Sequence, residues 1–301
     1  MKIPPMNRRD IPLIGMIESG QEELRREGVV SMRFRESLSK DPSRLTPHYH
    51  HFFQVSLFCG SGWLMHDFRE TRIGSDAVFF LSPGQVHTMH PDDGTDGTVI
   101  SFTREFFGEQ AAMLLDLPFF YATQRQPWIG LDPAQSLSFR ALFREVQSEY
   151  DRAETGANEV IRSLLRILFV RASRLYNTAE ASGSAQRGNK LVRDFHQSVE
   201  LHFRDWQTLE PYARELAISV NHLNDVIRET TGKSAGEHIR ARRLLDAKRL
   251  LLHSEWSVSE IGYHLGFRDP SYFSRFFRRY EMATPAEFRS AIREKYQKPG
   301  P

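Results

Sequence analysis

The sequence contains almost no cysteine: Cys59 is the only one among 301 residues. One thiol cannot form an intramolecular disulfide, and it cannot supply a cysteine-based zinc site. Long apolar runs are also missing, because no stretch approaches the ~20 apolar residues of a membrane span. Arg166 interrupts even the segment Leu164–Val170, and Met1–Asp10 has no apolar run of the kind found in secretory signals. We therefore expect a cytoplasmic protein that does not act at a membrane.

A strong charge of either sign is missing as well, since the net charge is only +2. The balance is uneven: residues 188–301 hold 19 basic and 15 acidic residues, a net charge of +4, whereas residues 1–187 hold 21 and 23, a net charge of −2. A basic C-terminal part is compatible with nucleic-acid binding, although many neutral domains vary by as much.

A polar segment divides the chain. Residues 177–190, NTAEASGSAQRGNK, are small and polar without periodicity, which is typical of an interdomain linker. Apolar residues make up 40% of the chain, enough for two buried cores, and the length favours two domains. We therefore predict a first domain at 1–176, a helical second domain at 191–291 and a tail at 292–301.

Before the linker, the sequence changes from strand-like to helix-like. Apolar runs at Phe52–Phe58, Asp76–Leu81 and Gly97–Phe102, separated by Gly- and Asp-rich turns, predict an antiparallel β-barrel or sandwich. The period from Thr103 to Tyr176 is helical. Its last helix, from about Asn158, carries a wide apolar stripe that either mediates dimerisation or packs inside the domain. The stripe consists of Ile161, Leu164, Leu165, Leu168 and Phe169.

After the linker, the sequence has helical periodicity and repeats itself weakly at an interval of 50 residues. Four pairs share this spacing: Leu223 and Phe273, Ile227 and Phe277, Ser234 and Thr284, and Glu237 and Glu287. One supersecondary unit therefore occurs twice. A helix over about His238–His253 joins the copies; at ~1.5 Å per residue it spans about 24 Å. Such a rod suits two helices held about one DNA turn apart, ~34 Å.

The second copy, about 258–280, has the pattern of a helix-turn-helix. A short amphipathic helix ends at Leu265, and Gly266 follows where the chain must turn sharply. Asp269 and Pro270 form an N-cap and first-turn pair that begins another helix. This helix turns its aromatic residues inward and its polar and basic residues outward, as a major-groove helix does. The candidate DNA-binding residues here are Ser271, Tyr272, Ser274, Arg275 and Arg279.

The first copy, about 209–230, matches in outline. Tyr212–Ala217 is the leading helix, Ser219 is the N-cap, and His222–Thr230 is the second helix. The candidate DNA-binding residues are Asn221, His222, Asn224, Asp225 and Arg228. A single such unit would favour an ordinary helical hairpin, whose arginines are merely solvated, over a DNA-binding unit. Two units at a fixed offset favour DNA binding.

These residues carry a resemblance to a known family. The string VSEIGYHLGFRDPSYFSRFFRRYEMATPAEFR, Val258–Arg289, and the run from Asn221 to Leu251 resemble the DNA-binding domain of AraC/XylS regulators. The resemblance implies groove-facing positions for Asn221, Asn224, Asp225, Ser271 and Arg275. Asp225 is acidic where many members have a basic or amide residue. It either accepts from cytosine N4 or, as we favour, only pairs with Arg228.

The front part resembles the cupin-like effector barrel of the same family over about Ser31–Phe102. The matching strings are HYHHFFQ, His48–Gln54, and LSPGQVH, Leu81–His87. Metal-binding cupins carry two histidines, a glutamate and a later ligand; here three histidines are present, but an amide replaces the glutamate. We therefore expect an effector pocket without metal or other cofactor, although a metal site and a purely structural role stay open. The candidate pocket residues are His48, His50, Gln54, Trp63 and His87.

Together these features predict an α+β protein of two domains: an antiparallel cupin-like barrel with flanking helices, and an all-α domain with two helix-turn-helix units joined by a long helix. The resemblance implies a DNA-binding transcription regulator rather than an enzyme, and an effector-responsive activator of a metabolic operon. Expected partners are double-stranded DNA, a small organic effector, RNA polymerase and a second copy of the chain. The alternatives are a cupin-type metal-dependent enzyme or sensor fused to a DNA reader, and an architectural DNA binder without ligand.

Overall fold

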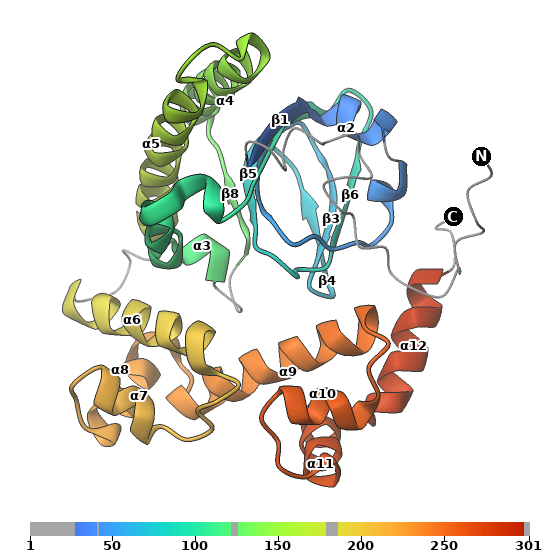
Figure 1. The fold of residues 1–301 in the computed structure, drawn as a ribbon, viewed down its shortest axis with the longest axis vertical. Helices are drawn as coiled ribbons and strands as arrows, with labels where there is room; N and C mark the ends of the chain where they lie inside the picture. The colour runs from blue at the N-terminus through green and yellow to red at the C-terminus, as the bar shows by residue number, and fades with distance from the viewer. Residues whose placement is uncertain (1–27, 41, 122–125, 179–185, 298–301) are drawn as a thin grey trace. The chain divides into compact units, whose positions relative to one another are not determined.

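The structure is a computed structural model that describes residues 28–40, 42–121, 126–178 and 186–297. The chain divides into two compact units, each with its own hydrophobic core. We call the described residues up to 178 the front domain and those from 186 the helical domain (Figure 1). No helix among the described residues is both long and apolar enough to cross a membrane.

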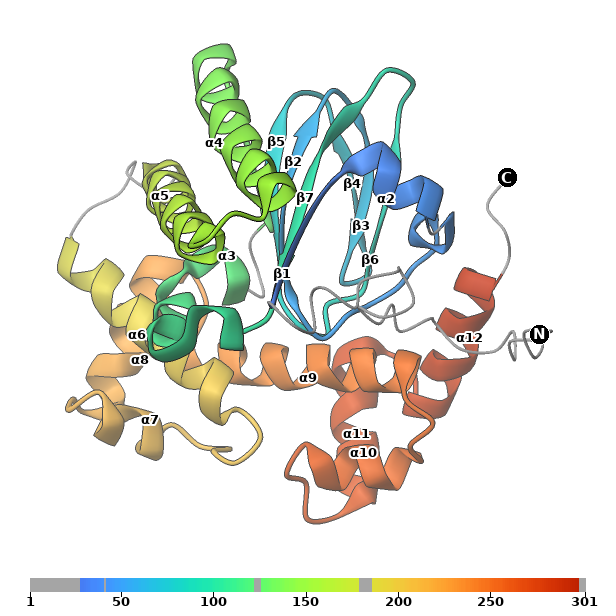
Figure 2. The same ribbon diagram turned by 45° about the horizontal axis from the view of Figure 1, so that its top comes forward.

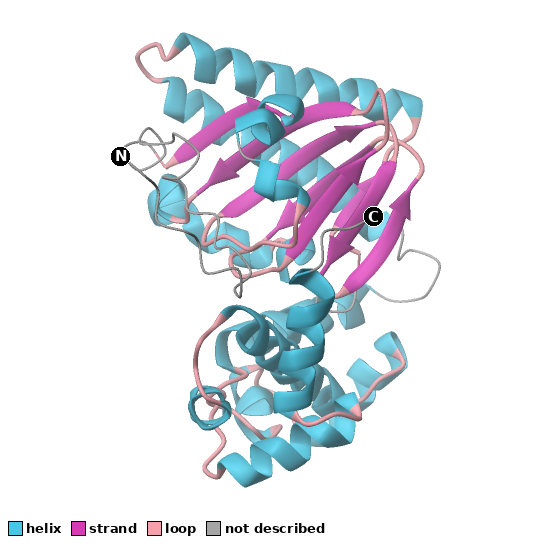
Figure 3. Cartoon of the chain, turned by 90° about the vertical axis from the view of Figure 1, so that its right-hand side faces the viewer, coloured by secondary structure: helices cyan, strands magenta, loops and turns pink. Residues whose placement is uncertain are grey.

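The front domain is built on two antiparallel sheets. The larger has the order β1-β7-β2-β5-β8, with β1 (Val29–Arg33), β7 (Asp96–Phe102), β2 (Phe53–Cys59), β5 (Ala77–Leu81) and β8 (Trp128–Gly130). The smaller has the order β4-β3-β6, with β4 (Arg69–Ile73), β3 (Gly62–His66) and β6 (His87–Pro91). The three strands predicted from apolar runs are confirmed as β2, β5 and β7 to within one residue. Figure 3 shows the strands in magenta with helices along them.

Helices flank these sheets as predicted. They are α2 (Phe34–Lys40), η1 (Pro42–Leu45), η2 (Glu105–Asp116), α3 (Pro118–Tyr121), α4 (Pro133–Arg152) and α5 (Ala157–Thr178). The long α4 starts sharply because Asp132 and Gln135 form a reciprocal capping box before Pro133. Helices α4 and α5 lie side by side, and their apolar faces belong to the front domain's core.

The apolar stripe on α5 is part of this core. Ile161, Leu165, Leu168 and Phe169 are at most 1% exposed, and Leu164 packs partly buried against them. Of the two interpretations of the stripe, packing inside the domain is therefore the one that the structure supports. The stripe is wide because the helix meets both the sheet and its neighbouring helices.

The helical domain contains seven helices among the described residues: α6 (Gln186–His202), α7 (Glu210–Glu215), α8 (Val220–Thr231), α9 (Ala235–His253), α10 (Val258–His264), α11 (Pro270–Glu281) and α12 (Pro285–Gln297). Helices α5 and α6 extend into the predicted linker at 177–190 from both sides, and its remainder, 179–185, lies outside the described residues. Most of the predicted tail at 292–301 is also helical, because α12 continues to Gln297.

Long helix α9 runs from the first helix-turn-helix unit to the second (Figure 2). It has 19 residues and begins three residues earlier than predicted, because Ser234 and Glu237 form a capping box at its start. Thr284 and Glu287 make the same reciprocal hydrogen bonds at the start of α12. Ser234 and Thr284, and Glu237 and Glu287, are two of the residue pairs separated by 50 residues. The sequence repeat at these positions therefore corresponds to a repeated helix start.

Candidate nucleic-acid interface and ligand cavity

Helices α8 and α11 present equivalent surfaces. Residues 221–230 and 271–280 have the same order of buried, half-buried and exposed side chains, position by position. Leu223 and Ile227 on α8, like Phe273 and Phe277 on α11, are completely buried. The sequence repeat is therefore a structural repeat, in which each second helix turns one polar face outward.

Most of the candidate DNA-binding residues lie on these outer faces. The exposed ones are Asn221, His222, Asp225 and Arg228 on α8, and Ser271, Tyr272, Arg275 and Arg279 on α11. Both helices have the predicted N-caps: Ser219 Oγ accepts from the His222 N–H at 3.1 Å, and Asp269 Oδ1 accepts from the Ser271 N–H at 2.8 Å. Each cap fixes the first turn, which is the part of a recognition helix that reaches base edges.

Two of the candidates already make structural hydrogen bonds. Asn224 is half-buried, and its Oδ1 accepts from the Ala235 N–H at 3.2 Å, at the start of α9. The equivalent Ser274 is also half-buried and donates from Oγ to the Pro270 carbonyl at 3.0 Å. The Asn224 bond ties α8 to α9, whereas the Ser274 bond lies within α11; both leave these side chains less polar surface for a base than their neighbours have.

Asp225 and Arg228 do not behave as predicted. Both side chains are exposed, and no ion pair joins them in the described part of the chain. The favoured interpretation, that Asp225 only pairs with Arg228, is therefore not what the structure shows. The Asp225 side chain is exposed to solvent instead.

The turn of the second helix-turn-helix unit is held by contacts that the sequence did not predict. Gly266 has a φ of +78°, and a Cβ at this position would lie 2.0 Å from the Arg204 carbonyl oxygen. Gln207 donates from Nε2 to the Gly266 carbonyl. From α9, Arg243 donates from Nη2 to the Leu265 carbonyl at 2.6 Å. The segment after α6 and the middle of α9 therefore hold the turn of the second unit.

Arg243 is unusual because it is buried among aromatic rings. Its guanidinium lies 4.0 Å from the centroid of the Phe267 ring and 6.0 Å from the centroid of the Phe276 ring. Burial lowers the pKa of Arg243 to about 10, so the side chain stays protonated at neutral pH. Phe267 is itself buried beside the turn, so the cation stacks on a ring that belongs to the packing of the turn.

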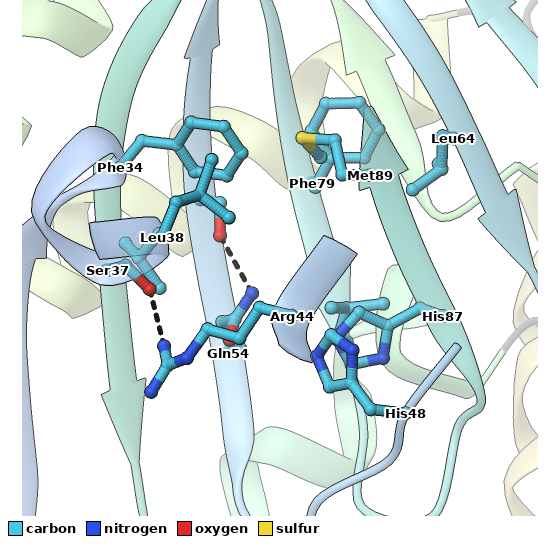
Figure 4. Close-up of a pocket in the computed structure, with 13 residues that line it drawn as sticks. Phe34, Ser37, Leu38, Arg44, His48, Gln54, Leu64, Phe79, His87 and Met89 are labelled. Atoms are coloured by element: carbon cyan, nitrogen blue, oxygen red, sulfur yellow. Dashed lines mark hydrogen bonds between the residues drawn. The ribbon is translucent and has the colours of Figure 1, made fainter. Parts of the chain in front are cut away.

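A small cavity of about 50 Å³ lies inside the front domain. Side chains of both sheets line it, together with α2 and η1; they are Phe34, Ser37, Leu38, Arg44, His48, Gln54, Ser56, Leu64, Phe79, Leu81, His87, Met89 and Val99. Figure 4 shows its two chemically different regions. Phe34, Leu38, Phe79, Leu64 and Met89 gather in one region, while Arg44, Gln54, His48 and His87 gather in the other.

The histidines of the polar region are held by the backbone. His48 and His87 pair as an isolated bridge, and their ring centroids are 4.2 Å apart. His48 Nδ1 donates to the Thr46 carbonyl at 2.8 Å, and His87 Nδ1 donates to the Gln85 carbonyl at 3.1 Å, because a carbonyl oxygen can only accept. Burial, reinforced by His48 and His50, lowers the pKa of His87 well below 6.5, so this ring is neutral.

Three of the five candidate pocket residues line the cavity, and two do not. His48, Gln54 and His87 are on its wall. His50 is buried beside it and stacks on Phe52 at 3.9 Å between ring centroids. His48 and His50 both precede β2, which begins at Phe53, so they do not lie on one face of that strand.

Trp63 lies elsewhere. Its side chain is 52% exposed on β3, with the Arg72 guanidinium 5.6 Å from its ring centroid. Sequence reasoning missed Arg44, which comes from a short helix with no recognisable motif. It also missed Met89 and Ser56, although alternation from His87 and Gln54 could have found both.

The histidine cluster does not have the arrangement of a metal centre. Among the described residues, no group of three or more His, Cys, Asp or Glu side chains could hold a metal ion. His50 Nδ1 and Nε2 are buried and have no hydrogen-bond partner among the described residues.

Comparison with known proteins agrees with this architecture. An AraC-like ligand-binding domain profile matches residues 34–169, and a helix-turn-helix domain profile matches residues 212–291. The chain belongs to the AraC family of DNA-binding transcription regulators. One of the matching profiles describes a ligand-binding domain and the other a helix-turn-helix domain, and neither describes an enzyme.

Individual AraC-family relatives match parts of the chain. The HTH-type transcriptional activator RhaS of Escherichia coli O157:H7 (strain EC4115 / EHEC) is 32% identical over 149 residues, which are 50% of this chain and 51% of that protein. The chain thus spans about half the length of the curated relatives it matches.

Two solved structures are similar. The DNA-binding domain of AdpA, a global transcriptional factor solved with a target DNA, has 28% identity and a TM-score of 0.33, covering 36% of this chain and 97% of that one. ToxT from Vibrio cholerae strain SCE256, with a bound unsaturated fatty acid, has 18% identity and a TM-score of 0.40, covering 81% and 89%.

Proposed function

We infer that this AraC-type chain is a sequence-specific, effector-responsive activator of a metabolic operon, acting in the cytoplasm. The observation that carries the DNA-binding half is the matched pair of polar faces on α8 and α11. Each face follows an N-capped first turn and opposes a fully buried apolar face, so each is rigid and presented to solvent. Recruitment of RNA polymerase to the bound promoter belongs to the same proposal.

The DNA-binding half is tested with the helical domain alone. A fragment that begins at residue 186 contains every helix of this domain and its complete core. We expect it to shift duplex DNA carrying its promoter site, and its affinity should fall steeply with salt because phosphate contacts supply most of it. A folded fragment that shows no salt-sensitive shift would overturn this proposal.

The sensing half is assigned to the front-domain cavity. Its wall combines apolar carbon with a few convergent polar groups, which is the composition of small-molecule sites. Since side chains from both sheets meet there, we also propose that the sheets close around it as a cupin-like barrel. The domain limits at 1–176 and 191–291 belong to this proposal, and limited proteolysis should cleave between them first.

A homodimer through the front domain is a separate part of the proposal. The buried stripe of α5 is not available for it, but Val160, Ile167 and Val170 on the same helix are 42%, 45% and 50% exposed. These three side chains recur at helical spacing, so they share one outer side. Light scattering on residues 1–180 decides the point, and a monomer at tens of micromolar would contradict it.

A further inference from the structure

We propose that Arg204 and Gln207 lock the two helix-turn-helix units into one rigid body and thereby fix the spacing between the two base sequences that the chain recognises. This inference rests on the sequence-specific DNA binding proposed above and names residues that determine one property of the target. It is carried by residues 203–207, which follow α6 and contact both units. We call this segment the bridge.

The bridge belongs to the packing of the first unit. On the leading helix α7, the Tyr212 hydroxyl donates to the Trp206 carbonyl at 3.1 Å, and the two rings meet edge to face at 5.1 Å between centroids. Phe203 is 4% exposed and is part of the helical domain's core. Helix α6, from which the bridge continues, packs against both α7 and α8. The backbone of the bridge is therefore fixed relative to the first recognition helix.

The same bridge contacts the turn of the second unit. The Arg204 carbonyl lies so close to Gly266 that a Cβ there would be 2.0 Å from its oxygen, and Gln207 donates from Nε2 to the Gly266 carbonyl. Ala217, the left-handed residue in the turn of the first unit, is exposed instead, with a φ of +55°. Gly266 is therefore a docking point between the two units as well as a turn residue.

Ion pairs fasten the bridge to the middle of α9. Arg204 donates from Nη2 to Asp246 Oδ2 at 3.0 Å. Arg242 donates to the other oxygen of Asp246 at 3.3 Å and to Glu200 on α6 at 2.7 Å. Its guanidinium lies 4.1 Å from the centroid of the Phe203 ring. The side chains of Glu200, Arg242 and Asp246 are at most 12% exposed, so salt screens these pairs less than it screens surface pairs.

The bridge gives the second unit a second attachment. Helix α9 alone would be a bendable connection, because long helices curve. With the bridge, the second unit is held both by α9 and at Gly266, and two separate attachments suppress the swing that one would allow. Each base pair adds about 3.4 Å of rise and about 35° of rotation to B-DNA. A rigid pair of recognition helices therefore fits one spacing, and one inserted base pair moves the second base sequence out of place.

The first test measures tolerance to spacing. DNA is selected from a random pool by the full chain, footprinting locates the two contacted stretches, and one base pair is inserted between them. By fluorescence anisotropy, we expect the wild type to lose at least tenfold in affinity on insertion. The double variant Arg204→Met with Gln207→Ala should lose less than threefold. Arg204→Lys, which keeps a cation for Asp246, should behave as the wild type does.

Lys190→Met is the matched control. It also removes a cation from an ion pair of the helical domain, but its partner Asp194 lies on the same helix, α6. Its loss on insertion should equal that of the wild type, and thermal melting shows whether each variant is folded. The inference is overturned if the wild type tolerates the insertion within twofold, or if the folded double variant loses as much affinity as the wild type.

A second measurement needs no DNA. Cys59 is the only native cysteine, so Cys59→Ser leaves the full chain free for spin labels at Glu229→Cys on α8 and Arg278→Cys on α11. With the bridge intact, we expect one narrow distance distribution between the labels by electron spin resonance, and a broad one in the double variant. A broad distribution with the bridge intact overturns the rigid body. A pool that yields no bound DNA overturns the DNA-binding proposal instead, so the two failures are distinguishable.

Discussion

His50 is an imidazole enclosed in the front domain. It is 1% exposed, stacks on Phe52, and has no hydrogen-bond partner among the described residues for either ring nitrogen. Burial, reinforced by the charge of His48, lowers the pKa of His50 from 6.5 to about 3. The folded state therefore keeps this ring neutral at pH values where the unfolded chain protonates it.

This difference makes stability depend on pH. As the pH falls from about 6.5 towards 3, the imidazole is protonated in the unfolded state but stays neutral in the folded state. The free energy of unfolding therefore decreases by up to about 1.4 kcal/mol per pH unit for each such group. We expect His50→Phe, which keeps the stacked ring, to reduce this slope by one proton. Urea denaturation of the front domain at a series of pH values measures it. An unchanged slope would show that His50 is already charged in the folded state.

On the outer face of α11, two arginines should differ in role. Arg275 is exposed beside Tyr272, its guanidinium 5.9 Å from the ring centroid, whereas Arg279 lies one turn further along the helix beside Tyr280. Because early residues of a recognition helix reach base edges, Arg275→Ala should cost about 1–3 kcal/mol on the specific site and relax discrimination at one base pair. Arg279→Ala should weaken binding to all sequences evenly. Affinities across a base-substitution series measure both, and identical profiles would refute our assignment of the helix face.

At the scale of elements, the turn of the second unit is the point most sensitive to change. Gly266→Ala would place a methyl group against the Arg204 carbonyl in a left-handed conformation. We expect it to destabilise the helical domain by more than about 2 kcal/mol, since the left-handed conformation alone costs a non-glycine residue roughly 1–2 kcal/mol. It should also weaken DNA binding, because the turn positions α11.

Gly232 provides the matched control. It ends α8 with a φ of +74°, but a Cβ there meets nothing within 4 Å. Gly232→Ala should therefore cost only the conformational part, about 1 kcal/mol. Thermal or chemical denaturation of the two variants separates the cost of the left-handed conformation from the cost of the steric clash. Equal losses of stability would show that the contact with the Arg204 carbonyl is unimportant.

Sequence patterns predicted the elements better than the cavity. The helix starts at Ser219 and Asp269 could be predicted because capping is a local interaction between residues two or three apart. The cavity wall is assembled from strands and short helices far apart in the chain, so Arg44 carried no local signal. Trp63 was misplaced because β3, which has no clear alternation, was not recognised as a separate strand.

At the scale of the whole molecule, the effector can act only through a difference between conformational states. A ligand shifts an equilibrium by its differential affinity for the two states and by nothing else. The cavity and the recognition helices belong to different compact units with separate cores. Coupling must therefore pass through the arrangement of the units, and the fragment from residue 186 should lack it.

We therefore expect the effector to change DNA occupancy by the full chain and to leave the fragment unaffected. His87→Phe should remove the response of the full chain while the DNA affinity of the fragment stays as before. Fluorescence anisotropy with labelled promoter DNA, with and without ligand, compares the two proteins. A fragment that responds to the ligand would place the effector site in the helical domain instead.

The two recognition helices match in burial but not in chemistry. The exposed candidates on α8 carry an amide, an imidazole, a carboxylate and one guanidinium group, whereas those on α11 carry two hydroxyls and two guanidinium groups. We therefore expect one chain to recognise two different base sequences in a fixed order, so its target should not be palindromic within the stretch of DNA that one chain contacts. Such a site has a direction. Inverting it in the promoter would turn the bound protein to face away from the gene, so orientation as well as sequence should decide whether transcription starts.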